Sequence, residues 1–129
     1  MTGEIALDTN VVIAYFKGEA QVKDKLLALS KVYLPVPVAG ELLFAAENSA
    51  RRQENLVLYR EFIQACRVLN ITRRTATFYA RIRAMLKRQG RPIPENDLWI
   101  ASLCVEKGLP LASRDEHFRE VPELLWERW

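Results

Sequence analysis

Several residue types that mark common protein classes are scarce in this sequence. Cysteine occurs only at Cys66 and Cys104, with no metal-ligand spacing, so we expect small buried thiols rather than a zinc site or a secreted disulfide framework. No apolar run approaches the roughly 20 residues that a membrane span needs. Charged Glu4 and Asp8 come too early for the apolar region of a signal peptide. Together these gaps favour a reducing, cytoplasmic setting.

Glycine and histidine are also scarce. The chain has 5 glycines in 129 residues and no glycine-rich phosphate-binding motif. His117 is the single histidine. Because the sequence around it offers no evident partner, we interpret His117 as a surface or structural residue.

Acidic residues are missing from one long stretch. Between Phe62 and Pro94 there is no Asp or Glu, yet this stretch holds 8 of the 19 basic residues, so 11 basic residues face 16 acidic ones elsewhere. A basic segment beside an acidic remainder favours a polyanionic partner, although a solvated helix face has the same composition. The candidates for phosphate contacts are Arg81, Arg83, Lys87, Arg88 and Arg91.

Short apolar runs alternate with longer helical patterns over a length that suits one domain, residues 1–129. The runs predict strands at 5–7, 32–34, 68–69, 109–112 and 124–126. Helical spacing and capping residues predict helices at 11–16, 19–29, 38–48, 55–66 and 97–107, and a long helix through 75–86 that Gly90 ends. Two prolines predict a loop at 91–96. Strands separated by helices imply an α/β fold in which helices flank both faces of a parallel sheet.

Four acidic residues are predicted to lie at the same end of that sheet. Asp8 follows the first strand, and Asp115 lies just beyond the strand at 109–112. Asp97 begins a helix, and Glu41 is expected in the first turn of the helix after Pro37. Because sites in such sheets form outside the carboxyl ends of the strands, we expect the four carboxylates to line one pocket.

A pocket of four carboxylates would be electrostatically costly without a cation, so it would either raise the pKa values of the carboxylates or recruit a metal. Two like charges about 5 Å apart repel by roughly 3 kcal/mol at an effective dielectric near 20. Hard oxygen ligands select Mg²⁺ or Mn²⁺ over zinc, and Mg²⁺ can activate water against a phosphodiester. Asn10, Asn96 and Ser113 are predicted to support the carboxylates or their waters. Taken singly, each acid is also explained as a helix cap, a helix-dipole partner or a turn former.

Four segments in order over nearly the whole chain carry a further signal. They are Leu7-Asp8-Thr9-Asn10, Gly40-Glu41-Leu42, Pro94 through Ala101 and Leu109 through Phe118. These segments resemble the PIN-domain ribonucleases, most closely the VapC-type toxins of prokaryotic toxin–antitoxin pairs.

The resemblance implies a PIN fold and endonucleolytic cleavage of RNA with Mg²⁺ or Mn²⁺. It assigns the catalytic and metal-binding roles to Asp8, Glu41, Asp97 and Asp115, and Ser113 stands where relatives often have threonine. The basic candidates then become RNA contacts. The resemblance further implies a homodimer and an antitoxin that occludes the site.

Three other functions stay open. A receiver-type phosphoacceptor domain needs an acid at the end of a middle strand, whereas Val36-Pro37 follows the second strand without one. A non-catalytic RNA-binding or partner-binding module would use the basic segment alone. A PIN-fold nuclease with a housekeeping or DNA-directed role would keep all four acids.

Overall fold

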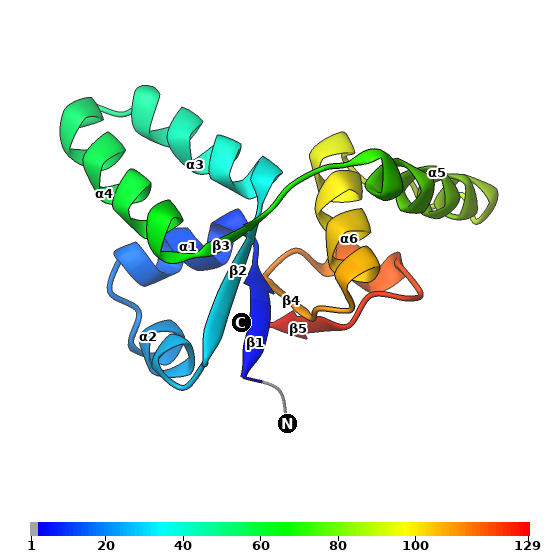
Figure 1. Ribbon diagram of the computed structural model, residues 1–129, viewed down its shortest axis with the longest axis horizontal. Helices are drawn as coiled ribbons and strands as arrows, with labels where there is room; N and C mark the ends of the chain where they lie inside the picture. Colours follow the sequence, from blue (N-terminus) through cyan, green and yellow to red (C-terminus); the bar gives the residue numbers. More distant parts are fainter. Residues whose placement is uncertain (1–2) are drawn as a thin grey trace.

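A five-stranded parallel sheet forms the centre of the computed structural model, which describes residues 3–129 (Figure 1). The first two residues of the predicted 1–129 domain lie outside the described residues. The strands are β1 (Glu4–Leu7), β2 (Lys31–Pro35), β3 (Arg67–Leu69), β4 (Leu111–Ser113) and β5 (Trp126–Arg128). Their order is β3-β2-β1-β4-β5, and all four neighbouring pairs are parallel. The predicted α/β class and parallel sheet are confirmed, with β5 at an edge.

Helices cover both faces of this sheet. They are α1 (Thr9–Phe16), α2 (Ala20–Leu27), α3 (Val36–Glu47), α4 (Arg52–Ala65), α5 (Arg73–Arg88), α6 (Glu95–Lys107) and the short 3₁₀ helix η1 (Glu116–Glu120). In Figure 1, α1, α2 and α4 lie on one side of the sheet, and α5 and α6 lie on the other. Helix α3 packs against α4 and also contacts α1 and α6. None of the helices in residues 3–129 has the length and apolar character of a membrane span.

The central strand and one helix form most of the core around the site. Ile5, Ala6 and Leu7 of β1 are all buried because helices cover both faces of this strand. Helix α6 is buried along most of its length, including Ile100 and Leu103. Each fully buried side chain of this size contributes about 1.5–3 kcal/mol. The two elements that bear Asp8 and Asp97 are therefore rigidly placed.

Prolines explain three of the boundaries that differ from the predicted ones, whereas β5, predicted at 124–126, is observed at Trp126–Arg128 with no proline involved. Helix α3 starts at Val36, because Pro37 is tolerated in a first turn whose N–H groups need no partner. Glu41 is therefore in the second turn, and its expected first-turn position was wrong.

Glu95 and Asn96, predicted to be loop, are helical, since Pro94 restricts the residue before it rather than those after it. Strand β4 starts only at Leu111, because Pro110 has no N–H for the ladder.

Candidate active site

Asp8 is the most buried carboxylate of the site. It follows β1, caps the N-terminus of α1 and is 3% exposed. The Ser113 hydroxyl donates to its Oδ2 at 2.6 Å, and the Thr9 N–H donates to its Oδ1 at 2.8 Å. Hydrogen bonds from two segments about a hundred residues apart thus hold both carboxylate oxygens. Capping and site formation are therefore compatible roles for Asp8.

Glu41 joins three helices at the mouth of the site. The Thr9 hydroxyl of α1 donates to its Oε1. The Asn96 amide of α6 donates to its Oε2 at 3.2 Å. These two contacts hold the Glu41 carboxylate between the first turns of α1 and α6. Thr9 had no predicted role beyond helix capping, although it lies between Asp8 and Asn10 in the first matched segment.

Asp97, Asp115 and His117 form a second group beside Asp8. One ligand atom from each of the three lies within 4.8 Å of the other two. His117 Nε2 is 2.8 Å from Asp97 Oδ2, a close contact that opposes the rise in the pKa of Asp97. The Asp115 N–H donates to Ser113 Oγ at 3.0 Å. The Ser113 hydroxyl thereby links Asp115 to Asp8.

The predicted carboxylates line one cavity of about 490 Å³. Its lining residues are Asp8, Thr9, Asn10, Glu41, Asp97 and Asp115. The cavity lies where β1 and β4 end, beside α3 and the first turn of α6. His117 reaches the same group of acids from η1, whereas its sequence suggested only a surface or structural residue. Its position two residues after Asp115 was the available signal.

Burial and the neighbouring acids raise the pKa of two of the carboxylates. Burial raises the pKa of Asp8 to about 6, and the nearby charges of Asp97 and Asp115 add to this rise, while the hydrogen bonds from Ser113 and Thr9 oppose it. Burial also raises the pKa of Asp97, with Asp115 and Glu41 adding and the neighbouring His117 opposing. A bound cation would stabilise the ionised form of each group.

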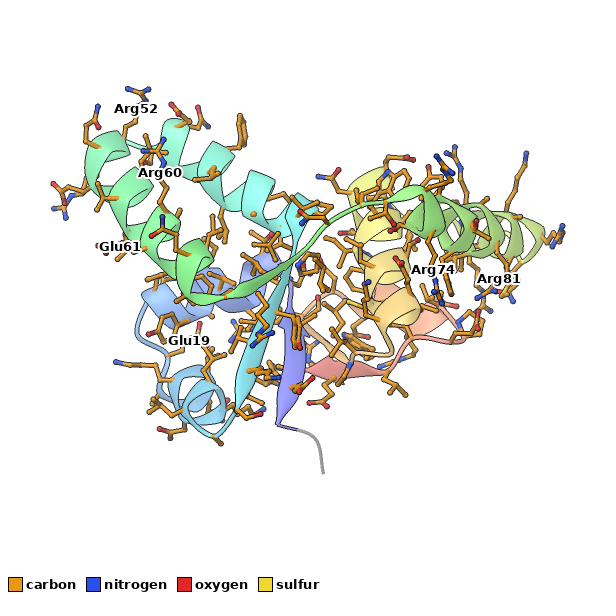
Figure 2. All side chains as sticks on the ribbon, viewed as in Figure 1. Glu19, Arg52, Arg60, Glu61, Arg74 and Arg81 are labelled. Atoms are coloured by element: carbon orange, nitrogen blue, oxygen red, sulfur yellow. The ribbon has the colours of Figure 1, made fainter. Side chains whose placement is uncertain are left out.

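A network around Arg114 holds the turn that carries Asp115. The Arg114 N–H donates to Asn10 Oδ1 at 3.2 Å, so Asn10 fixes this turn and donates to no carboxylate in the described part of the chain. The Arg114 guanidinium donates to both carboxylate oxygens of Glu19, at 2.6 and 3.2 Å, and to Trp129 O at 3.1 Å. Figure 2 shows Glu19 close to the start of α2. Through Arg114, the loop before α2 and the last residue thus hold the turn that carries Asp115.

The basic candidates lie on and just after α5, apart from the acidic cavity. Figure 2 shows Arg81 on the side of α5 that faces the C-terminal segment, where it pairs with Glu123 at 2.9 Å. Arg83 is 3.4 Å from Glu95, and Arg91 is 2.5 Å from Glu120. Over residues 3–129 no ion pair is recorded for Lys87 or Arg88. The structure therefore divides the five candidates into three paired and two unpaired cations.

The amino-acid sequence matches the family model of the PIN domain over residues 5–124. The chain belongs to the PIN-domain family. The tRNA(fMet)-specific endonuclease VapC of Shigella flexneri is 32% identical over 126 residues, which cover 95% of this chain and 96% of that protein. Ribonuclease VapC2 of Haemophilus influenzae is 30% identical with the same coverage.

Solved structures agree with this PIN domain along its whole length. DNA-bound VapBC from Salmonella typhimurium superposes with a TM-score of 0.91 at 28% identity, covering 100% of this chain and 99% of that one. VapBC2 from Rickettsia felis gives the same TM-score at 23% identity, covering 98% of each chain, which shows the shared fold.

The donors in this PIN domain suit the divalent metal that PIN nucleases use. Carboxylate oxygens dominate the cavity, and hard oxygen donors favour small hard cations. The imidazole of His117 is a single additional nitrogen donor. Burial first, and the neighbouring carboxylates second, raise the pKa of Asp8 and Asp97, and a cation held among these acids would oppose both effects.

Proposed function

We propose that this PIN domain is a Mg²⁺- or Mn²⁺-dependent endoribonuclease, the toxin of a type II toxin–antitoxin pair. The observation that carries the proposal is the convergence of Asp8, Glu41, Asp97 and Asp115 on one cavity. Two relatives support it, since one is named a tRNA(fMet)-specific endonuclease and the other a ribonuclease.

In this proposal the four carboxylates hold the cation and also catalyse the reaction. When bound, the cation supplies a Lewis acid for the scissile phosphate and lowers the pKa of an attacking water. Ser113 and Thr9 fix the orientation of Asp8, and Asn96 fixes that of Glu41, through the hydrogen bonds described above. The Thr9 hydroxyl also donates to Glu41, so that Thr9 contacts both Asp8 and Glu41. The protein thus contributes a site organised before substrate arrives.

We assign substrate contacts to the basic residues beside the site. Arg81, Arg83, Lys87, Arg88 and Arg91 would contact RNA phosphates, because α5 packs against α6, which carries Asp97. Two relatives are named as tRNA(fMet)-specific endonucleases, so initiator tRNA is the first RNA to test.

The partners and setting follow from the same proposal. An antitoxin would occlude the cavity, and an arginine from it would pair bidentately with the carboxylates in place of the metal. A homodimer is also proposed, with Phe44 of α3 and Val57 of α4 as exposed apolar area for it, at 68% and 56% exposure. A cytoplasmic location supplies the RNA substrate and keeps Cys66 and Cys104 as the free thiols seen here.

The test is cleavage of initiator tRNA, total RNA and single-stranded DNA by purified protein with Mg²⁺, Mn²⁺ or a chelator. We expect internal cuts in RNA that need metal and disappear in Asp8→Asn. Activity that survives the chelator would contradict the metal-dependent mechanism. Cleavage of DNA alone would instead support a DNA-directed PIN nuclease.

A further inference from the structure

A second cavity lies between α5 and α6, separate from the acidic one. It has a volume of about 260 Å³ and is lined by Arg83, Leu86, Lys87, Pro92, Ile93, Glu95 and Leu98. Four of its lining residues are apolar (Leu86, Pro92, Ile93 and Leu98) and three are charged (Arg83, Lys87 and Glu95), so apolar side chains and charged groups face the same cavity. Its volume falls just below the roughly 300 Å³ at which drug-sized ligands begin to fit. A ligand the size of one nucleobase suits it better.

The polar side of this cavity is organised around the Glu95 carboxylate. The Tyr79 hydroxyl donates to Glu95 Oε2, and Arg83 lies 3.4 Å from Glu95 Oε1. Arg83 also donates to the Tyr79 hydroxyl at 2.6 Å. The Tyr79 ring stacks on Trp99 with centroids 3.9 Å apart. Glu95 is therefore held in place, and the lone pairs that these contacts leave can accept from a ligand.

The cavity and the acidic cluster lie on either side of the same helical turn. Glu95 and Asp97 both belong to the first turn of α6. Two residues along a helix are rotated by about 200°, so their side chains leave α6 on nearly opposite sides. The two cavities are therefore separated by the diameter of one helix, roughly 10 Å.

The charge at the rim favours a nucleic acid over other ligands. Lys87 and Arg83 are one helical turn apart on α5 and both line the cavity. Within residues 3–129 Lys87 forms no ion pair with an acidic residue, so its ammonium group can donate to a phosphate. Apolar side chains, a fixed hydrogen-bond acceptor and an adjacent cation in one cavity match a base, its amino group and its phosphate.

We propose that this cavity binds one unpaired nucleobase of the RNA, close to the scissile phosphate. The apolar walls contact the faces of the base, Glu95 accepts from its exocyclic amino group, and Lys87 contacts the adjoining phosphate. Uracil has no such amino group, so the cavity disfavours uracil at that position. This inference rests on the proposed ribonuclease function and adds a base preference to it.

The first test sequences the cut ends of an RNA pool that is randomised at unpaired positions. We expect wild-type protein to disfavour uracil at one position near the cut, and Glu95→Gln to reduce that bias by about fivefold or more, because an amide both donates and accepts. Glu54→Gln is the matched control: Glu54 is also a first-turn glutamate beside an arginine, Arg51, at 3.7 Å, but lies on α4. An unchanged profile in Glu95→Gln, or an equal change in Glu54→Gln, overturns the proposal.

The second test needs no cleavage, so it separates this inference from the proposed function. Methyl NMR of metal-free protein would follow Leu86, Ile93 and Leu98 while a short single-stranded RNA is added. We expect these methyls to shift and those of Leu69 and Leu109, in a separate apolar cluster, to stay unchanged. The same oligonucleotide without its bases should give no such shift. Equal shifts with the abasic strand, or no shift of these methyls with either strand, overturn the proposal even if RNA is cleaved.

Discussion

The acidic cavity and the basic face of α5 are held together in different ways. In the cavity, each described hydrogen bond to Asp8 or Glu41 comes from another part of the chain or from a helix start. On α5, Arg81 and Arg83 each pair with one exposed carboxylate, and Lys87 and Arg88 have no recorded pair in residues 3–129. The side chains of the cavity are therefore connected to one another by hydrogen bonds, whereas those of the basic face are held independently of one another.

This difference has an energetic meaning. A hydrogen bond to a buried charged group contributes about 1.5–3 kcal/mol, and an exposed ion pair contributes about 0–1 kcal/mol. Substitutions in the cavity should therefore have large, coupled effects, and substitutions on α5 should have small, additive ones. The difference suits a catalytic centre that needs fixed geometry and an RNA-binding surface that needs only charge.

The largest expected effect is that of Asp8→Asn on cleavage. Asparagine keeps the shape of Asp8 but is a poorer ligand for a hard cation, so we expect RNA cleavage to fall by more than about 100-fold. Loss would be measured as initial rates at saturating Mn²⁺. Asp24→Asn, at an exposed aspartate of α2, is the matched control and should keep full activity. Near wild-type rates in Asp8→Asn would remove this residue from the proposed centre.

The next effect is on stability, and it depends on pH. The folded pKa of Asp8 is about 6, above its ordinary value of 3.8, so ionising Asp8 costs the metal-free folded state about 3 kcal/mol. Its stabilising contribution is complete below about pH 4 and is lost as pH rises through 6. Asp8→Asn should therefore be the more stable protein above pH 6 when a chelator is present.

Urea unfolding between pH 4 and 8 would measure this difference, with and without Mn²⁺. Added metal should stabilise the wild type and stabilise Asp8→Asn much less. Parallel pH curves for the two proteins would show that Asp8 has no raised pKa in the folded state.

A smaller loss is expected from Ser113→Ala, which removes one hydroxyl from the cavity. Ser113 donates to Asp8 at 2.6 Å and accepts from the Asp115 N–H at 3.0 Å. Losing a group that orients metal ligands typically lowers metal affinity or activity by about 10–100-fold. The Mn²⁺ concentration for half-maximal cleavage should rise, and Ser113→Thr should restore it.

The matched control for Ser113→Ala is Ser102→Ala. Ser102 is also fully buried, but it donates to Leu98 O within α6, away from the carboxylates. Equal losses in both variants would indicate a general packing effect instead of a role at the site.

The same contrast explains what the sequence could predict. Strand and helix order followed from apolar periodicity, and the family was identified from four short segments, because both signals are local in the chain. The roles of Thr9 and His117 were not predicted, since each depends on side chains brought close only by folding, Glu41 and Asp97. Boundaries moved by one to three residues where tertiary hydrogen bonding and proline, rather than local pattern, decide where an element starts.

The predicted basic residues illustrate the same limit. From the sequence all five cations looked equivalent, but which ones have acidic partners depends on loops distant in the chain. Glu120 and Glu123, which pair with Arg91 and Arg81, lie beyond β4. The predicted RNA contacts remain a hypothesis, and the structure divides the five residues into cations with an acidic partner and cations without one.

The smallest expected effect separates these two classes of cation. Binding of single-stranded RNA would be measured over a range of salt concentrations with Asp8→Asn as the background, so that no cleavage occurs. Lys87→Ala and Arg88→Ala should each flatten the slope of log affinity against log salt by about 0.7, because each removes one phosphate contact. Arg81→Ala should flatten it less, since Glu123 already neutralises that guanidinium at 2.9 Å. Equal slopes for all three variants and the parent would show that this face of α5 does not contact the RNA backbone.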